Sequence, residues 1–426
     1  MKYYKAGEEI FELELKEYPF FCKFCKKEKA IIEIPSQKVK VCKNCYNTFF
    51  ENRIKKTIEK YKMLKPQDKV GVFLSGGKDS STLLIVLKKL YPDINLQAIF
   101  LNLGIRYYSE KVENLVKNLC QNLNVPLYIY NLPQKEGYRI DDFVFTHFKN
   151  KICSACGAIK RYLFSKIAKE LKLTVIATGH HLDDIVSTML TLFFQGNFSG
   201  IAKLEPVLQP FFPNHAKKIK PLYTTPEKEI FYYIVLNEIP VGNFTCPHAE
   251  ITPSKKIKKI LTDFEKENRQ IKYQLLSVFT KKLIPLIKSH PTYKEEKSLN
   301  ICIKCGEITS ASDNICSRCK KVELLNKIED KALELSYEEF KDFVKNLDSN
   351  WVLIDLKEKE HLLNESSKKL IKFFKPYRNK YIFLVSSDPE IGYLFALKLR
   401  KKRFKAYSII KIPEKEYLEF HNREDL

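Results

Sequence analysis

The 426-residue sequence contains no apolar run of about 18 residues, the length at which a segment predicts a membrane-spanning helix. The first residues also lack the apolar core of a secretory signal, because Glu8, Glu9, Glu12 and Glu14 follow at once. There is no internal repeat beyond the cysteine modules described below, and no long low-complexity tract. We therefore expect a cytoplasmic chain of folded domains that does not bind a membrane.

Acidic residues are in short supply. The chain has 51 Asp and Glu residues against 74 Lys and Arg residues, which gives a formal net charge of +23. A charge of this size attracts polyanions. Nucleic acid is the commonest such partner, because contacts to phosphates release counterions. A lysine-rich, solvated surface is the alternative that charge alone leaves open.

No cysteine follows Cys319, yet the sequence before it holds twelve. In the absence of a secretory signal, this number indicates metal or redox chemistry instead of a disulfide framework. Cys120 and Cys246 stand alone. The other ten form Cys-x-x-Cys pairs, namely Cys22/Cys25, Cys42/Cys45, Cys153/Cys156, Cys302/Cys305 and Cys316/Cys319.

The first two pairs and the last two pairs each form a module in which a loop separates two Cys-x-x-Cys motifs. Four thiolates can close a tetrahedral zinc shell, and such sites contribute folding energy. We expect one zinc ion in each module. The modules would staple the chain and would present the lysines around them to RNA. The expected ligands are Cys22, Cys25, Cys42 and Cys45 in the first module, and Cys302, Cys305, Cys316 and Cys319 in the second.

Between the modules, short apolar strands alternate with helices. Strands are predicted at residues 70–74, 96–101, 126–130 and 175–178, and helices at 80–90, 110–123, 158–171 and 183–194. This alternation is typical of an α/β fold with a doubly wound parallel sheet and helices on both faces.

Ser75-Gly76-Gly77-Lys78-Asp79-Ser80 lies between the first strand and its helix. Glycines let backbone N–H groups approach an anion, and the helix N-terminus adds unpaired donors. Lys78 supplies charge, and Ser80 and Ser81 supply hydroxyls. The motif is not Walker A. It resembles the PP-loop of N-type ATP pyrophosphatases, which transfer AMP to a substrate oxygen and release pyrophosphate.

Thr178-Gly179-His180-His181-Leu182-Asp183-Asp184 follows the strand at 175–178. It resembles the Gly-His-x-x-Asp-Asp element of the tRNA-modifying branch of this group. The adjacent carboxylates could hold Mg²⁺ or a substrate group. They could equally cap the helix that begins there.

Cys153 and Cys156 precede a predicted helix that carries Lys160 and Arg161, and Cys246 comes much later. Three soft thiolates suit an iron–sulfur cluster with one open iron. A zinc site or free buried cysteines stay open as alternatives. In combination with the flanking modules and the two loops, this order of motifs resembles the 2-thiouridine tRNA synthetases over about residues 20–325.

The resemblance implies ATP-dependent 2-thiolation of tRNA, with adenylation of the uridine C2 oxygen followed by sulfur insertion. It implies ATP with Mg²⁺, a [4Fe–4S] cluster on Cys153, Cys156 and Cys246, and catalytic roles for these thiols, Lys78, Asp183 and Asp184. A ubiquitin-like thiocarboxylate protein or sulfide would donate sulfur, and the protein would be a homodimer. The expected nucleotide contacts are Ser75, Gly76, Gly77, Asp79, Ser80, Ser81, Leu101, Lys160 and Gly179.

Two other functions are compatible with parts of the sequence. A PP-loop ligase of the amidating or lysidine type would use the same loop and would not need the three central cysteines. A non-catalytic RNA-binding scaffold would account for the charge, but it leaves the intact PP-loop unexplained.

The C-terminal part predicts a small α/β domain that resembles a degenerate rhodanese. Rhodaneses carry sulfur on a cysteine directly after the central strand, and here Ser386 follows the strand at 381–385. A hydroxyl cannot form a persulfide, so we expect this domain to dock a partner or RNA. The expected domains are 1–50 (zinc finger), 51–298 (PP-loop domain), 299–325 (zinc finger) and 326–426 (connector and rhodanese-like domain).

Overall fold

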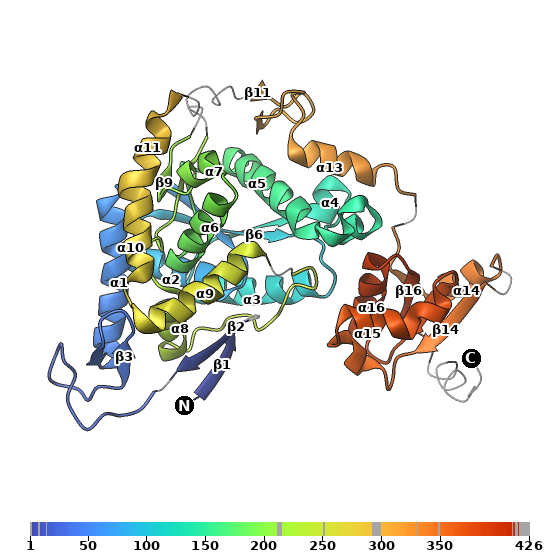
Figure 1. The fold of residues 1–426 in the computed structure, drawn as a ribbon, viewed down its shortest axis with the longest axis horizontal. Coiled ribbons are helices and arrows are strands. Elements are labelled where there is room, and N and C mark those ends of the chain that lie inside the picture. Colours follow the sequence, from blue (N-terminus) through green and yellow to red (C-terminus); the bar gives the residue numbers. More distant parts are fainter. Residues whose placement is uncertain are drawn as a thin grey trace. The chain divides into compact units, whose positions relative to one another are not determined.

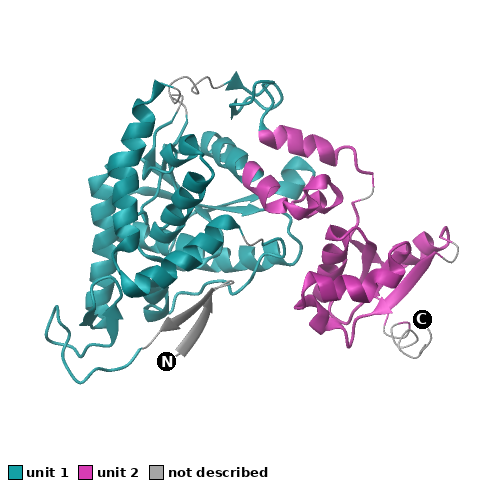
Figure 2. Cartoon of the chain, in the orientation of Figure 1, with its two compact units in different colours: residues 1–137, 159–316 teal, residues 138–158, 317–426 magenta. Residues whose placement is uncertain are grey.

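The computed structural model describes most of the chain, in two compact units (Figure 2). The first comprises residues 1–137 and 159–316, and the second comprises residues 138–158 and 317–426. Within the described residues, none of the helices combines the length and the hydropathy that a bilayer crossing requires. The described ranges are 2–6, 9–13, 15–210, 215–249, 252–291, 300–329, 331–347, 350–410, 412–413 and 416.

A six-stranded sheet forms the centre of the first unit (Figure 1). Its strand order is β7-β6-β5-β8-β10-β9, and every neighbouring pair is parallel except β9 with β10. The strands are β5 (Lys69–Leu74), β6 (Asn95–Asn102), β7 (Leu127–Asn131), β8 (Val175–Ala177), β9 (Val207–Leu208) and β10 (Lys217–Ile219).

Helices cover both faces of this sheet, as the alternation of elements predicted. Alternate residues of β5, Val70, Val72 and Leu74, join one core cluster with side chains of α2, α3 and α8. On the opposite face, the ring of Phe73 lies 4.0 Å from the ring of Phe164 on α5. The helices concerned are α2 (Lys78–Leu90), α3 (Tyr108–Asn122), α5 (Ile152–Glu170) and α8 (Glu227–Leu236).

The chain reverses its direction across the sheet at β5. It runs outward through β6 and β7, then returns to place β8 on the other side of β5. Ligands of open α/β sheets bind at the carboxyl ends of strands at such a reversal. The loops after β5 and β8, which carry the two predicted nucleotide motifs, therefore lie side by side there.

The other elements of the first unit flank the sheet. A β1–β2 hairpin and a β3–β4 hairpin precede α1, and a β11–β12 hairpin lies within the second cysteine module. α6 packs against α7, α9 and α10. Their bounds are β1 (Lys2–Ala6), β2 (Glu9–Leu13), β3 (Ile32–Ile34), β4 (Val39–Val41), α1 (Lys43–Lys60), α4 (Leu132–Glu136), α6 (Leu182–Phe194), α7 (Phe198–Ala202), α9 (Pro253–Glu267), α10 (Ile271–Val278), η3 (Phe279–Leu283), α11 (Ile284–Ser289), β11 (Asn300–Ile301) and β12 (Ile308–Thr309).

The second unit contains a four-stranded, fully parallel sheet in the order β13-β16-β15-β14. Core clusters cover both of its faces. Its elements are η1 (Asp141–Phe145), η2 (His147–Asn150), α13 (Ser317–Leu325), β13 (Glu334–Ser336), α14 (Tyr337–Val344), β14 (Trp351–Asp355), η4 (Glu360–Leu363), α15 (Ser367–Phe374), η5 (Lys375–Tyr377), β15 (Tyr381–Val385), α16 (Pro389–Lys401) and β16 (Lys405–Ile410).

Two local predictions need correction. β13 lies in the expected connector, where the sequence predicts no strand. A strand of three residues is too short to show a period of its own. α5 begins at Ile152, not near residue 158, so Cys153 and Cys156 lie within its first turns instead of preceding it.

Candidate functional site

The predicted phosphate loop joins β5 to α2, and Gly77 is the N-cap of α2. Gly77 has no side chain to bond the first N–H groups of the helix, and a helix start without a side-chain cap suits an anion. Ser80 holds the loop closed, because its hydroxyl accepts from the Ser75 N–H at 3.1 Å. The loop thus has the geometry of an anion cradle.

Three glycines bring separate loops into contact at this cradle. Gly76 has φ of +71°, and a Cβ there would lie 2.5 Å from a Val112 methyl carbon. A Cβ on Gly179 would lie 3.0 Å from the backbone of Asp79, so the loop after β8 approaches the PP-loop closely. The Gly242 N–H donates to the Gly76 carbonyl at 3.1 Å. Sequence reasoning did not identify Gly242.

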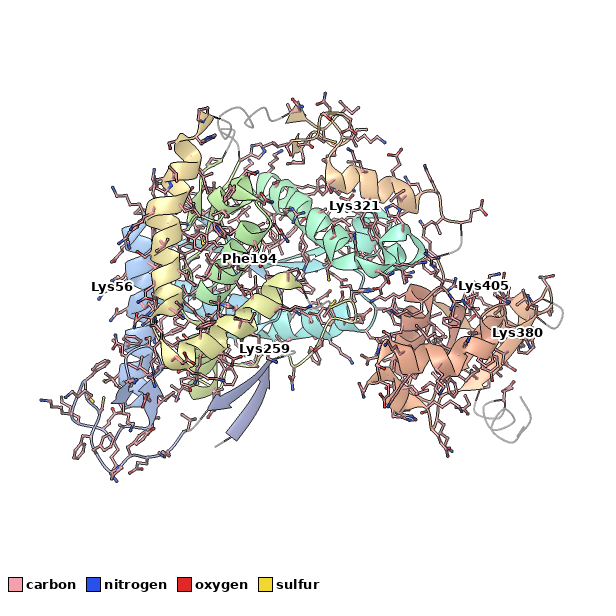
Figure 3. The ribbon with its side chains drawn as sticks, in the orientation of Figure 1. Lys56, Phe194, Lys259, Lys321, Lys380 and Lys405 are labelled. Atoms are coloured by element: carbon pink, nitrogen blue, oxygen red, sulfur yellow. The ribbon has the colours of Figure 1, made fainter. Side chains whose placement is uncertain are left out.

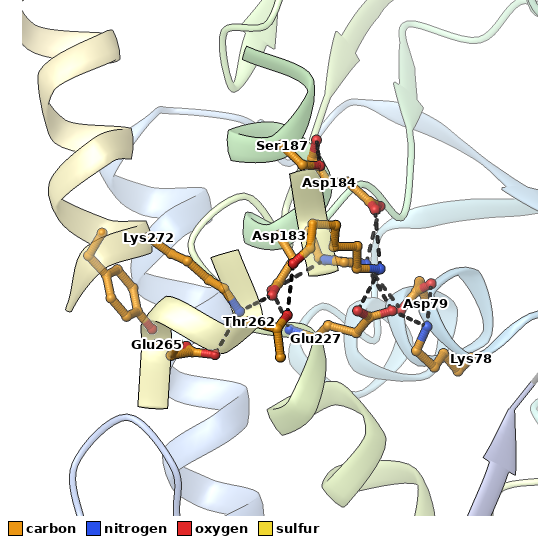
Figure 4. Close-up of polar contacts among 12 residues, drawn as sticks. Lys78, Asp79, Asp183, Asp184, Ser187, Glu227, Thr262, Glu265 and Lys272 are labelled. Atoms are coloured by element: carbon orange, nitrogen blue, oxygen red, sulfur yellow. Dashed lines mark hydrogen bonds and ion pairs between the residues drawn. The ribbon is translucent and has the colours of Figure 1, made fainter. Parts of the chain in front are cut away.

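Lys78 points into a buried network of charges (Figure 4). Its ammonium lies 2.6 Å from Glu227 Oε1 and 3.3 Å from Asp79 Oδ2. Lys258 of α9 lies 2.6 Å from the other oxygen of Glu227. Glu227 therefore holds two ammonium groups beside the loop.

His181 is the centre of this network and is buried. Burial disfavours the imidazolium, but the carboxylates of Asp184, Asp79 and Glu227 outweigh it and raise the pKa of His181 well above its usual value. Burial also opposes ionisation of Glu227, yet His181, Lys78 and Lys258 outweigh it and hold the Glu227 pKa well below its usual range. The site thus carries alternating fixed charges.

Asp183 and Asp184 have different surroundings. Asp183 is buried, accepts from the Glu227 N–H at 2.8 Å and lies 2.5 Å from the Lys272 ammonium. Asp183 therefore bonds the start of α8. The predicted capping role on its own helix is wrong, because the N-cap of α6 is His181 and no side chain caps it. Asp184 is about one-third exposed and lies 3.2 Å from His181 Nε2.

Asp79, His181 and Glu227 offer three ligand atoms within 4.8 Å of one another. Glu227 pairs with Lys78 and Lys258, whereas Asp79 Oδ1 and His181 Nδ1 are buried and make no hydrogen bond within the described residues. Asp79 and Asp184 are the less buried carboxylates here.

Two predicted nucleotide contacts lie on neighbouring elements. Leu101, near the end of β6, is one residue beyond the last β5–β6 pair, Leu74 with Phe100. The backbone edge of Leu101 that faces β5 therefore lies outside the β5–β6 ladder. Lys160 is half-buried on α5.

The three central cysteines belong to different units. Cys153 and Cys156 are in the second unit, where they lie three residues apart on α5 and hence on one helical face. Cys246 is in the first unit, four residues after Gly242, on the loop that bonds the PP-loop. All three thiols are half-buried.

Each outer module gathers its four thiols. The four ligand atoms of either module lie within 4.8 Å of one another, and Sγ–Sγ distances are 3.8 Å for Cys25–Cys42 and 3.6 Å for Cys305–Cys316. A tetrahedron of sulfurs around zinc has edges of about 3.8 Å. The first thiol of each module, Cys22 or Cys302, is desolvated, but N–H donors from neighbouring backbone outweigh this and lower its pKa to about 6.

Sequence reasoning missed Glu227, Lys258 and Lys272 in the network around Lys78. None of the three belongs to a recognisable motif, and only the fold brings each of them to the loops. The one available signal was that Glu227 directly follows Pro226, at a predictable helix start.

Comparison with known proteins agrees with this geometry. Residues 46–241 match the family model of the PP-loop domain. A tRNA-5-methyluridine(54) 2-sulfurtransferase of Pyrococcus horikoshii is 34% identical over 299 residues, which covers 70% of this chain and 92% of that protein. Cytoplasmic tRNA 2-thiolation protein 1 of Aspergillus niger is 27% identical, and the alignment covers 72% of this chain and 89% of that protein.

A solved structure adds the same relationship in three dimensions. The U34-tRNA thiolase NcsA from Methanococcus maripaludis, determined with its [4Fe–4S] cluster, is 25% identical and aligns with a TM-score of 0.61. The alignment covers 73% of this chain and 98% of that one. The chain therefore belongs to the family of tRNA 2-thiolating sulfurtransferases built on a PP-loop domain.

Proposed function

We propose that the chain activates the C2 oxygen of a tRNA uridine with ATP and then replaces that oxygen with sulfur. The observation that carries this proposal is the uncapped N-terminus of α2 beside the paired ammonium groups of Lys78 and Lys258. These donors would hold the phosphates of ATP. The uridine C2 oxygen attacks the α-phosphorus, the bond to pyrophosphate breaks, and the oxygen becomes part of an AMP leaving group.

Individual residues have distinct tasks in this step. Residues 75–81 would bind phosphate oxygens, the backbone of Leu101 would contact adenine, and Gly179 and Lys160 would line the nucleotide site. Mg²⁺ arriving with ATP would be reached by Asp79 and Asp184, which are the less buried carboxylates. Asp183 would act indirectly, because it fixes the start of α8 and with it Glu227.

Cys153, Cys156 and Cys246 would hold a [4Fe–4S] cluster. Two of these thiols are half-buried on one helical face, the third is half-buried on a loop bonded to the PP-loop, and thiolates are the soft donors that iron–sulfur clusters take. A cluster with three protein ligands would supply an open iron for sulfide. Sulfide would form a bond to C2 of the activated uridine while the bond from C2 to the AMP oxygen breaks.

The remaining features fit the same substrate. Two zinc ions would occupy the outer modules, and exposed lysines such as Lys56 and Lys259 would contact tRNA phosphates (Figure 3). We further propose a cytoplasmic homodimer that takes sulfur from sulfide or a ubiquitin-like thiocarboxylate protein. The C-terminal sheet is proposed to be a rhodanese-like domain without sulfur chemistry, because Ser386 follows β15.

An isotope experiment tests the activation step. The protein is incubated with ATP, sulfide and tRNA labelled with ¹⁸O at the uridine C2 position. Adenylation of that oxygen requires the label to appear in AMP, which mass spectrometry detects. Unlabelled AMP formed together with 2-thiouridine would contradict the mechanism.

A further inference from the structure

The segment before the central cysteine pair packs against the C-terminal sheet domain within the second unit. α16 contacts both η1 and η2, and these two short turns lead directly into α5. The PP-loop family match ends at residue 241, so the sheet at 334–410 lies outside it. The match to the PP-loop family therefore does not include the α16 side of this contact.

A buried hydrogen bond is the centre of the contact. The hydroxyl of Tyr393, on α16, donates to the carboxylate of Asp141, on η1. Tyr393 is 1% exposed and Asp141 is 0% exposed. Hydrogen bonds to buried carboxylates are among the stronger ones, and the loss of one partner leaves a desolvated group.

Cationic side chains add further contacts to the same segment. Arg400 of α16 lies over the ring of Phe145, 5.2 Å from its centroid. Lys321 of α13 lies 4.9 Å from the centroid of Phe148. Contacts of this kind contribute most where the cation is partly desolvated.

The segment needs such support from outside. η1 and η2 are 3₁₀ turns of five and four residues, and turns of this length are not stable by themselves. Ile140 and Phe143 are buried, so the turns depend on packing. Cys153 and Cys156 follow within the first turns of α5, so the positions of η1 and η2 determine where both thiols lie.

We infer that the C-terminal domain is a positioning element for the central cysteine pair. Tyr393 and Arg400 hold residues 138–150 in one arrangement, and this arrangement fixes the start of α5 and both thiols. The inference rests on the proposed role of these thiols as cluster ligands. It gives the domain a function that needs no cysteine of its own.

Thiol reactivity in the full-length, reduced, cluster-free protein tests the inference. Tyr393→Phe removes one hydroxyl and keeps the ring. We expect alkylation of Cys153 and Cys156 by iodoacetamide to become about tenfold faster, with a similar rise in hydrogen exchange over residues 138–158. Alkylation of Cys246 and exchange in β14–β16 should stay at wild-type rates. Arg400→Gln should act in the same direction.

Tyr381→Phe is the matched control, because it removes a tyrosine hydroxyl from β15 of the same domain, where the ring contacts Phe343 and Tyr407. It should leave all rates unchanged. After reconstitution, a chelator should remove iron faster from Tyr393→Phe than from the control, as followed by visible absorption. Unchanged reactivity of both thiols, or equal loosening of β14–β16, would overturn the inference. None of the three readouts uses ATP or tRNA, so the result is independent of the proposed thiolation.

Discussion

Two of the strand–loop–helix connections in the described part of the chain share a design and differ in chemistry. In the first, β5 leads through residues 75–77 to α2, whose N-cap is Gly77 and carries no capping side chain. In the second, β15 leads through residues 386–388 to α16, whose N-cap Asp388 accepts from the Glu390 N–H at 2.9 Å. One helix start is open to a ligand, and the other is occupied by its own carboxylate.

This difference shows what converts a common α/β turn into a nucleotide site. A helix N-terminus attracts an anion only if its donors are unused and its surroundings tolerate negative charge. At the PP-loop, Lys78 and Lys258 supply compensating charge. At the second loop, the Asp388 carboxylate already accepts from the Glu390 N–H and would repel a phosphate.

A side chain added inside the PP-loop should have the largest effect, and this effect should be on ATP binding. Gly76→Ala places a Cβ about one ångström inside contact distance of Val112, at a positive φ. We expect ATP affinity, measured by calorimetry, to fall by at least about 100-fold. Gly137→Ala is the control, since Gly137 also has positive φ but has open space around it. Equal loss in both variants would point to backbone strain instead of loop closure.

The second largest effect is expected when Glu227, which pairs with the ammonium groups of Lys78 and Lys258, loses its charge. Glu227→Gln keeps the size of the side chain, and we expect kcat/KM for thiolation to fall about 10- to 100-fold. The pKa of His181, followed by NMR, should fall because one of its carboxylate neighbours is lost. Glu265→Gln, which affects a residue that pairs with Lys272, is the control and should change both quantities less. An unchanged His181 pKa would argue against the network.

Acid should weaken the first unit through the same carboxylates. The pKa values of Glu227 and Asp183 are held below their usual values, so their stabilisation is present above the unfolded values near 4 and is lost as pH falls through the folded ones. His181 has the opposite shift, and its contribution is fully present at acidic pH. Below about pH 4.5, the unfolding free energy should fall more steeply with pH in the wild type than in Glu227→Gln. Parallel denaturation curves would contradict this.

The second loop should respond least. Asp388→Ala removes an exposed cap, and the C-terminal domain should lose about 1 kcal/mol in chemical denaturation. ATP affinity should not change. A change in ATP affinity would mean that the two loops are coupled.

The sequence predicted those parts of the site that are local in the chain. The PP-loop, the Gly-His-His loop and the four-cysteine modules can each be recognised from a short stretch of sequence. The α/β alternation is consistent with both loops lying at one edge of the sheet. Glu227, Lys258 and Gly242 could not be predicted, because isolated residues on separate elements become partners only through tertiary packing. β13 was missed because its pairing with β16, not its composition, defines it.

Anaerobic thiolation of unmodified tRNA is the most direct test of ATP-dependent sulfur insertion by this chain. The reconstituted protein is incubated with ATP, Mg²⁺ and sulfide, and the tRNA nucleosides are analysed by mass spectrometry and mapped to position. We expect 2-thiouridine at one position in an amount equal to the AMP released, and neither product with Gly76→Ala. Thiolation that proceeds without ATP, or ATP cleavage that never yields 2-thiouridine, would contradict it.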